Sequence, residues 1–475
     1  MKVSILPNSE IENVITYDTV HQLLRHFPKH EINIPQQILQ LLLVQNELKD
    51  KLESSPVLLR LAVNLVLNQG LKKLASINSR AERILVGRFM EDKFAKEVAA
   101  ELGISRDRIQ REQREAIKDL VDILRKNEHE ARKQHVDLMV QPLGIPSYTR
   151  LFGMDRVCHQ LVEQLLTEGH PWNITITGIG GIGKSSIADQ VIRQAVNNLH
   201  YQRVIKLYIR SGSLTESQLI EYLAETLLLN STGIPQNEQI AQIRHLLKTV
   251  SHLIFIDNLE SDISHLFDFL ETLSRPSRFL LTVREQPVKK NRVYVLPIKP
   301  LSLENSADLI RHLAQNGQAY QELASIADEQ IKRIYEKVGG NPLALKLVVG
   351  LVNTFSIPDI LEDLKSIQHD DTKKMYLHIF WNSWQALDDI SQRVLQVFPL
   401  ISGKGEVSEV IYKIVKGKYS ELTNEDVTNA LSNLVTRSLV EVSGSVWSNS
   451  YLYSIHNLTR SFLTTNIIDW PSDSI

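Results

Sequence analysis

One stretch of the sequence combines glycines, a lysine and serines in a spacing that suits phosphate binding. It reads Gly-Ile-Gly-Gly-Ile-Gly-Lys-Ser-Ser from Gly178 to Ser186, after an apolar run and before a helical pattern. Glycines let successive backbone N–H groups turn toward phosphate oxygens, and the positive end of the following helix adds to their field. A ligand-free turn would need the glycines but not the lysine and hydroxyl. The loop's predicted nucleotide-binding residues are Gly178, Gly180, Gly181, Ile182, Gly183, Lys184, Ser185 and Ser186.

Each polar residue of this loop has an expected role. Lys184 is expected to reach the β- and γ-phosphates, and the Ser185 hydroxyl to coordinate Mg²⁺. Such a site also needs a carboxylate at the end of a buried strand, and Asp257 follows the apolar run Leu253–Ile256. Asp257 is therefore a candidate metal ligand with Ser185 and a candidate catalytic residue with Lys184. The alternative is a core strand that ends in a solvated aspartate.

Two further residues are candidates for activating water or for contacting the γ-phosphate. Glu260, three residues after Asp257, is a candidate base for activating water. Arg284 follows another buried run, Phe279–Val283, and is either a sensor of the γ-phosphate or an ordinary surface arginine.

The elements that must position these residues alternate between strand and helix patterns, which favours a parallel α/β sheet. Helical patterns return from Ser302, and a small hairpin is expected from Leu439–Val442 and Tyr451–Ile455. The β-rich runs are Ile174–Thr177, Val204–Ile209, Leu253–Ile256, Phe279–Val283 and Val293–Leu296, with helical segments at Ser185–Asn198 and Glu216–Leu229.

Composition sets the broad class of the protein. With 475 residues, 43% hydrophobic and 23% charged, the chain is expected to form about three globular domains. Its single cysteine excludes an intramolecular disulfide, and its net charge of −2 gives no overall attraction to nucleic acid. The absence of a secretory signal pattern and of a long apolar run predicts a cytoplasmic protein with no membrane partner.

Together these motifs resemble the NB-ARC branch of the STAND signal-transduction ATPases. Gly340-Asn341-Pro342-Leu343-Ala344 is similar to the family's G-x-P motif, and Tyr453–Leu458 is similar to its Met-His-Asp motif. Leu151–Asp155 resembles the motif that opens the nucleotide domain. The resemblance runs from about Leu151 to the C-terminus. It implies a P-loop domain, a helical domain and a winged helix, with ATP or ADP and Mg²⁺ as cofactors.

The resemblance adds two nucleotide-binding residues and shows three departures. It implies that Pro342 packs near the adenine and that His456 contacts the β-phosphate. Met154 stands where the family usually has arginine, Asn258 where many members have a second aspartate, and Asn457 where the Met-His-Asp motif has its aspartate.

A second resemblance lies in the N-terminal third. Glu97–Ile109 has the small residue, the glycine turn and the capping serine of a helix-turn-helix, and is similar to the DNA-binding region of sigma factors. Its second helix would present the candidate DNA-binding residues Arg106, Arg108, Arg111 and Arg114. Seven Lys and Arg against five Asp and Glu between Ser105 and Lys126 give only a modest positive charge. A helical adaptor for protein contacts is the alternative.

These observations predict a multidomain α and α/β protein. The expected regions are an N-terminal helical region (1–80), a helix-turn-helix-like region (81–135), a linker (136–150), a P-loop domain (151–300), a helical domain (301–370) and a winged helix (371–475).

The expected function is an ATP/ADP-controlled switch and slow ATPase. ATP exchange would open the domains and promote self-association, and the N-terminal output would be transcription control or defence signalling. The alternatives are an adaptor with structural ADP and a continuously cycling ATPase. Since the chain stops at Ile475, sensing is expected to use the N-terminal helices, a partner or the nucleotide pool.

Overall fold

The computed structural model describes most of the chain. The described residues are 5–27, 34–48, 55–167, 169, 171–209, 214–227, 229, 234–259, 263–284, 293–316, 326–352, 354–363, 372–401, 406–445 and 450–467. Only the backbone is described at residues 106, 316, 363, 372–374, 443–445, 450 and 457. The chain forms two compact units. The N-terminal unit comprises residues 1–141 and 195–202, and the C-terminal unit residues 142–194 and 203–475.

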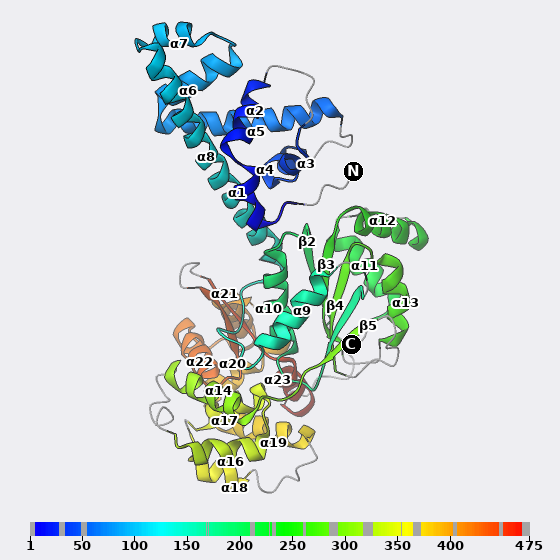
Figure 1. Ribbon diagram of the computed structural model, residues 1–475. Coiled ribbons are helices and arrows are strands. Elements are labelled where there is room, and N and C mark those ends of the chain that lie inside the picture. The colour runs from blue at the N-terminus through cyan, green and yellow to red at the C-terminus, as the bar shows by residue number, and fades with distance from the viewer. Residues whose placement is uncertain are drawn as a thin grey trace. The chain divides into compact units, whose positions relative to one another are not determined.

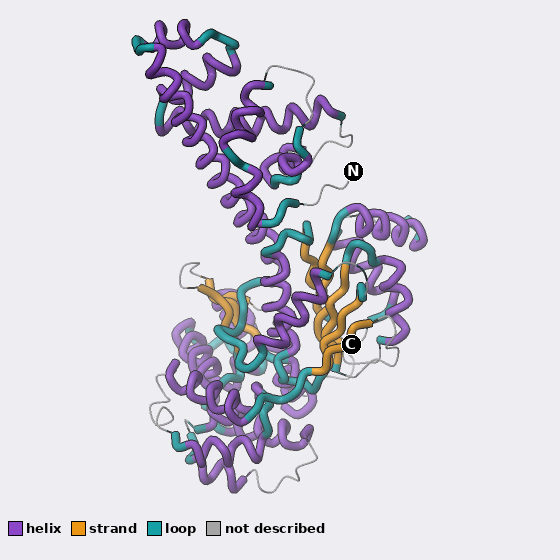
Figure 2. The backbone as a smooth tube through the Cα atoms, in the orientation of Figure 1, coloured by secondary structure: helices purple, strands orange, loops and turns teal. Residues whose placement is uncertain are grey.

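The N-terminal unit is helical (Figures 1 and 2). Two long helices, α5 (Pro56–Ile77) and α8 (Arg106–Val140), begin at Ser55 and Ser105, whose hydroxyls accept backbone N–H bonds in the first turn. Gly70 lets α5 approach α8 closely, because a Cβ there would lie 2.9 Å from Leu120. The shorter helices are α1 (Ile11–Val14), α2 (Tyr17–Arg25), α3 (Gln36–Leu39), α4 (Leu42–Leu48), α6 (Ser79–Leu85), the π-helix η2 (Val86–Met90) and α7 (Ala95–Leu102).

A buried ion pair joins α8 to the start of this unit. Glu128 is fully buried, bonds to Arg132 at 2.7 Å, and accepts the N–H groups of Leu42 and Leu43 at the start of α4. These bonds satisfy a carboxylate that would otherwise be costly to bury. They also help to explain why α8 continues to Val140, into the range 136–150 that the sequence predicts as a linker.

The C-terminal unit contains a five-stranded parallel sheet in the order β2-β3-β4-β1-β5, which confirms the parallel α/β prediction. Figure 1 shows α9 and α10 on one face and α11, α12 and α13 on the other. The strands are β1 (Asn173–Thr177), β2 (Arg203–Tyr208), β3 (His252–Leu259), β4 (Arg278–Val283) and β5 (Val293–Pro297). The helices are α9 (Asp155–Leu166), α10 (Lys184–Val196), α11 (Glu216–Thr226), α12 (Gln236–Thr249) and α13 (Ser264–Leu273).

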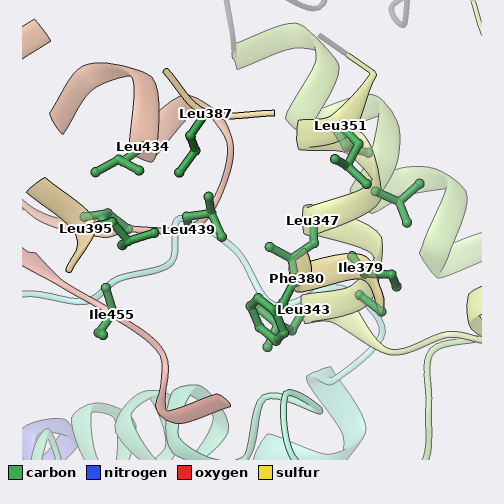
Figure 3. Close-up of a cluster of buried hydrophobic side chains, with 14 of the residues drawn as sticks. Leu343, Leu347, Leu351, Ile379, Phe380, Leu387, Leu395, Leu434, Leu439 and Ile455 are labelled. Atoms are coloured by element: carbon green, nitrogen blue, oxygen red, sulfur yellow. The ribbon is translucent and has the colours of Figure 1, made fainter. Parts of the chain in front are cut away.

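The rest of this unit shares one hydrophobic core. Figure 3 shows side chains of the predicted helical range, such as Leu347 and Leu351, in one cluster with Leu434 and Ile455 of the predicted winged-helix range. Its helices are α14 (Leu303–Asn316), α16 (Asp328–Val338), α17 (Pro342–Leu351), α18 (Ile357–Asp363), α19 (Thr372–Gln385), α20 (Asp389–Leu395), α21 (Ser408–Lys418), α22 (Asn424–Thr436) and α23 (Asn457–Phe462).

A small antiparallel sheet, β6-β8-β7, completes the unit and is called the C-terminal sheet below. Its strands are β6 (Glu406–Val407), β7 (Glu441–Ser445) and β8 (Ser450–Ser454). The predicted hairpin corresponds to β7 and β8, with every strand end shifted by one to three residues. The two-residue β6 carries too few residues to show an alternating pattern. None of the helices in the described ranges is both long and apolar enough to cross a bilayer.

Candidate nucleotide-binding site

The predicted phosphate loop lies between β1 and α10, at the carboxyl end of a strand flanked by β4 and β5. This is where parallel α/β sheets bind ligands. Gly181 and Gly183 have φ values of 76° and 96°, which side-chain-bearing residues rarely adopt. The glycines therefore give the loop the backbone turn that was expected from its sequence.

Lys184 and Ser185 occupy the first turn of α10. The Lys184 Nζ donates to the carbonyls of Gly178, at 2.7 Å, and Ile179, at 3.0 Å, and this fixes the ammonium over the loop. The Ser185 hydroxyl donates to Oδ1 of Asp257 at 2.7 Å. Two residues that lie 72 positions apart in sequence thus meet at the end of β1 and β3.

Asp257 is held in place by a second hydroxyl that the sequence reasoning missed. Thr282 of β4 donates to the same Oδ1 at 2.5 Å, and Asp257 is 5% exposed. Carboxylate and hydroxyl oxygens are ligands that Mg²⁺ prefers, and Mg²⁺ usually binds through one or two such groups plus phosphate and water. The pair Ser185 and Asp257 therefore fits the predicted metal site.

Asn258 has a structural role that explains why a second aspartate is absent. Its φ of 72° lies in the left-handed region that asparagine tolerates, at an irregularity in the β3–β4 pairing. Its Nδ2 donates to the carbonyl of Ile209 at 2.7 Å, and its N–H donates to Thr282 at 3.0 Å. The candidate base Glu260 lies outside the described residues.

The phosphate loop is contacted from α17. Asn341 caps this helix by accepting the N–H groups of Leu343 and Ala344, and its Nδ2 donates to the Gly180 carbonyl at 3.0 Å. The Leu343 N–H also donates to the Gly181 carbonyl at 3.3 Å. A Cβ at Gly181 would lie 2.8 Å from that of Leu343, so the glycine is needed for this approach as well as for its φ.

The loop is also contacted from the segment that follows the C-terminal sheet. A Cβ at Gly180 would lie 3.1 Å from Leu458, the second residue of α23. His456 is the capping residue of this helix, and its Nδ1 accepts the Leu458 N–H at 3.1 Å. We call the arrangement in which Asn341, Leu343 and Leu458 contact the phosphate loop the closed arrangement.

The cap fixes the protonation state of His456. An Nδ1 that accepts a hydrogen bond is unprotonated, so the proton of the neutral ring is on Nε2, where it can be donated to an anion. Burial is the main cause that lowers the pKa of His456 below its ordinary value. Glu441 opposes this with the largest effect of any single nearby charge, and the cations Lys184, Lys346 and Arg284 each lower the pKa further. The imidazole is therefore a neutral donor at neutral pH.

A cavity of about 260 Å³ joins these groups. Predicted residues that line it are Gly180, Gly181, Ile182, Gly183, Lys184, Ser185, Ser186, Arg284, Pro342 and His456. Gly178 does not line it, but turns the chain at the end of β1 with φ 151°. Pro342 lines it together with the apolar residues Leu143, Ile145, Phe152, Leu301 and Leu309, which suit a base ring. The lining as a whole combines apolar side chains with cations and hydroxyls, which fits a nucleotide.

Several residues of the cavity were not predicted. Tyr148 lines it and donates to Oδ2 of Asp189 of α10 at 2.7 Å, while Arg193 donates to both oxygens of that carboxylate. Lys206, Lys346 and Glu441 also line it. Each lies outside a recognisable motif, so only the fold brings them to the site. Met154, the departure from the usual arginine, packs against the core beside the cavity.

The helix-turn-helix candidate lies in the N-terminal unit. Helices α7 and α8 are joined by Gly103, with φ 65°, Ile104 and Ser105, and a small core of Ile84, Val98, Ala99 and Ile109 lies beneath them. Arg108, Arg111 and Arg114 are exposed, whereas the Arg106 side chain is outside the described part. Arg108 bonds to Glu112 at 2.7 Å.

Comparison with known proteins supports an NB-ARC-type P-loop ATPase fold. The NB-ARC domain family matches residues 154–319. A protein from Arabidopsis thaliana that is named as a disease resistance protein is 25% identical over 43% of this chain and 25% of its own length. An uncharacterized WD repeat-containing protein from a Nostoc species is 24% identical over 59% of this chain and 24% of its own length. The chain thus spans about a quarter of these relatives.

Among solved structures, the chain is similar to a signal transduction ATPase with numerous domains from Pyrococcus horikoshii, which has a tetratricopeptide repeat sensor. The TM-score is 0.44 and the identity 17%, over 69% of this chain and 44% of the other.

Proposed function

We propose that the protein is a nucleotide-controlled switch that ADP holds in the closed arrangement and ATP releases. The observation that carries the proposal is that one phosphate loop is contacted by Asn341 and Leu343 from α17 and by Leu458 from α23. A ligand bound at this loop lies against groups that only the closed arrangement brings there. Such a ligand shifts the population of the arrangement by its difference in affinity for the two states.

The expected binding roles follow from the site. Lys184 and the loop N–H groups would hold the β- and γ-phosphates, and His456 would donate from Nε2 to a phosphate oxygen. Ser185 and Asp257 would hold Mg²⁺, which supplies charge neutralisation for the phosphates when bound. Thr282 and Ser185 orient Asp257, while the apolar wall at Pro342 would exclude water from the base.

The proposed turnover is slow. Asn258 is bonded to the carbonyl of Ile209 and, as an amide, has no basicity with which to take a proton from water. A slow ATPase that acts as a switch is therefore favoured over a continuously cycling one. An adaptor that keeps ADP as a structural cofactor would use the same contacts but would never exchange its nucleotide.

The proposed output is the N-terminal unit, through DNA binding by the α7–α8 pair or through protein contacts, and ATP-dependent self-association. The exposed Arg108, Arg111 and Arg114 support the DNA alternative, and the Arg108–Glu112 pair weakens it. The Arabidopsis thaliana relative named for disease resistance favours a signalling output of defence type.

The test is ADP release from wild type and His456→Ala. A hydrogen bond to a charged group is worth about 1.5–3 kcal/mol, so its loss should speed ADP release at least tenfold. Stopped-flow fluorescence measures the release, and light scattering with ATP measures self-association. ADP that co-purifies and never exchanges in wild type would favour the adaptor, and fast steady-state hydrolysis would favour the cycling ATPase.

A further inference from the structure

Glu441 places a carboxylate from the C-terminal sheet in the wall of the nucleotide cavity. It is the first residue of β7, pairs in register with Ser454 of β8, and is half-buried. It lines the cavity together with His456, Lys184 and Arg284. Among the described residues it forms no ion pair, so its charge is not cancelled by a bonded cation.

The second acidic residue of the cavity wall is already neutralised. Asp189 accepts bonds from Arg193 to both of its oxygens, at 2.7 and 3.2 Å, and a third from Tyr148. Asp257 accepts bonds from Ser185 and Thr282 and is not among the residues that line the cavity. Of the two carboxylates that line the described cavity wall, Asp189 and Glu441, Glu441 is therefore the one without a bonded cation.

Four charged residues from four elements converge around the His456 ring. Lys184 comes from α10, Arg284 from the end of β4, Lys346 from α17 and Glu441 from β7, and each of them acts electrostatically on the imidazole. Lys184 is the cation of the phosphate loop, so the negative charge of Glu441 lies at the phosphate end of the cavity. Charges in such a half-buried site are only partly screened by water.

We infer that Glu441 makes the closed arrangement selective for a nucleoside diphosphate over a triphosphate. This inference rests on the proposed function. A triphosphate adds negative charge at the cationic end of the cavity, and a like charge placed there penalises the wrong ligand without improving the contacts of the right one. Glu441 belongs to β7 of the C-terminal sheet. If that sheet moves away from the phosphate loop, the penalty disappears and the open arrangement can bind the triphosphate.

The experiment compares the affinities of the full chain for ADP and for a non-hydrolysable ATP analogue, with Mg²⁺, by titration calorimetry. For Glu441→Gln we expect the preference for ADP to fall by about tenfold, mainly through tighter binding of the triphosphate. Glu425→Gln is the matched control, because Glu425 is an exposed acid of α22 that does not line the cavity. It should leave the ratio of affinities unchanged.

A second variant keeps the test valid if Glu441→Gln unfolds. Lys346→Gln removes a cation from the same wall and should change the ratio in the opposite direction, raising the preference for ADP. An unchanged ratio in the Glu441 variant, or an equal loss of both affinities, would overturn the inference while leaving the switch proposal intact. Failure of the wild-type chain to bind either nucleotide would overturn the switch proposal itself.

Discussion

At the scale of single residues, Lys184 is the side chain on which nucleotide binding should depend most. Its ammonium is fixed over the phosphate loop by the carbonyls of Gly178 and Ile179. Lys184→Ala removes the cation nearest the phosphate loop, so we expect ADP and ATP affinities to fall by at least a hundredfold. A fluorescent-nucleotide titration measures this, with thermal unfolding as the control for folding. Wild-type affinity in the variant would contradict the assignment of the site.

His456 gives the closed arrangement a pH dependence. In the closed arrangement, burial and the cations Lys184, Lys346 and Arg284 lower the pKa of His456. Glu441 raises it, but the net shift is downward. If opening exposes the ring, its pKa returns to about 6.5. The open state then binds a proton that the closed state does not, so closure is fully favoured above pH about 6.5 and weakens as the pH falls below it.

The measurement is the hydrodynamic radius of the nucleotide-free protein between pH 7.5 and 5.5. We expect the open fraction to grow by up to about tenfold per pH unit below pH 6.5. His456→Gln, which has no titrating group, should remove this component. An identical pH profile in the variant would show that another group controls opening.

Only some of the site residues could be predicted from the sequence. Gly178 to Ser186 and Asp257 could be found because backbone turning, phosphate charge and metal ligation restrict the residue types at fixed spacing. Thr282, Tyr148, Lys346 and Glu441 could not, because each reaches the site from a separate element and its type is common on any surface. Only tertiary packing distinguishes them.

At the scale of elements, the α17 N-terminus couples helix capping to closure. Asn341 caps α17 and also donates to the Gly180 carbonyl, and it is 3% exposed. Asn341→Ala should cost about 1 kcal/mol of stability through the lost cap and, in addition, speed ADP release several-fold through the lost contact to the phosphate loop.

Thr423→Ala is the matched control for this variant. Thr423 caps α22 by accepting the Asp426 N–H but has no contact with the phosphate loop. It should lower the thermal midpoint to a similar extent and leave ADP release unchanged. Equal release rates in the two variants would mean that Asn341 acts only as a helix cap.

Element positions were easier to predict than element ends. The five parallel strands were predicted because each is a short run rich in apolar and β-branched residues, and helical patterns separate several of them. The end of α8 was not predicted, because its charged residues gave no apolar signal, whereas Glu128 and Arg132 are in fact buried as a pair. The short β6 likewise has no sequence signal of its own.

At the scale of the whole molecule, salt dependence distinguishes a DNA-binding from a protein-binding N-terminal unit. Exposed Arg108 and Arg111 lie on α8 just after the Gly103–Ser105 turn, but Glu112 bonds to Arg108 and reduces its effective charge. If this surface binds DNA, the affinity arises from phosphate neutralisation and must fall as salt rises. If it binds a protein, nucleic acid affinity should be weak at every salt concentration.

The test is charge reversal of both arginines, Arg108→Glu with Arg111→Glu. For a DNA-binding surface we expect loss of a mobility shift at low salt and a reduction of the salt slope by about two, one for each lost phosphate contact. Lys332→Glu with Arg333→Glu is the control, because both residues are exposed on α16 of the other unit and the net charge change is the same. A mobility shift that survives in the α8 variant, or that falls equally in both variants, would exclude a specific role for this helix. Because the switch proposal requires the two nucleotide states to differ, both variants are measured with ADP and with the ATP analogue, and only an ATP-dependent shift would link the N-terminal unit to the phosphate loop.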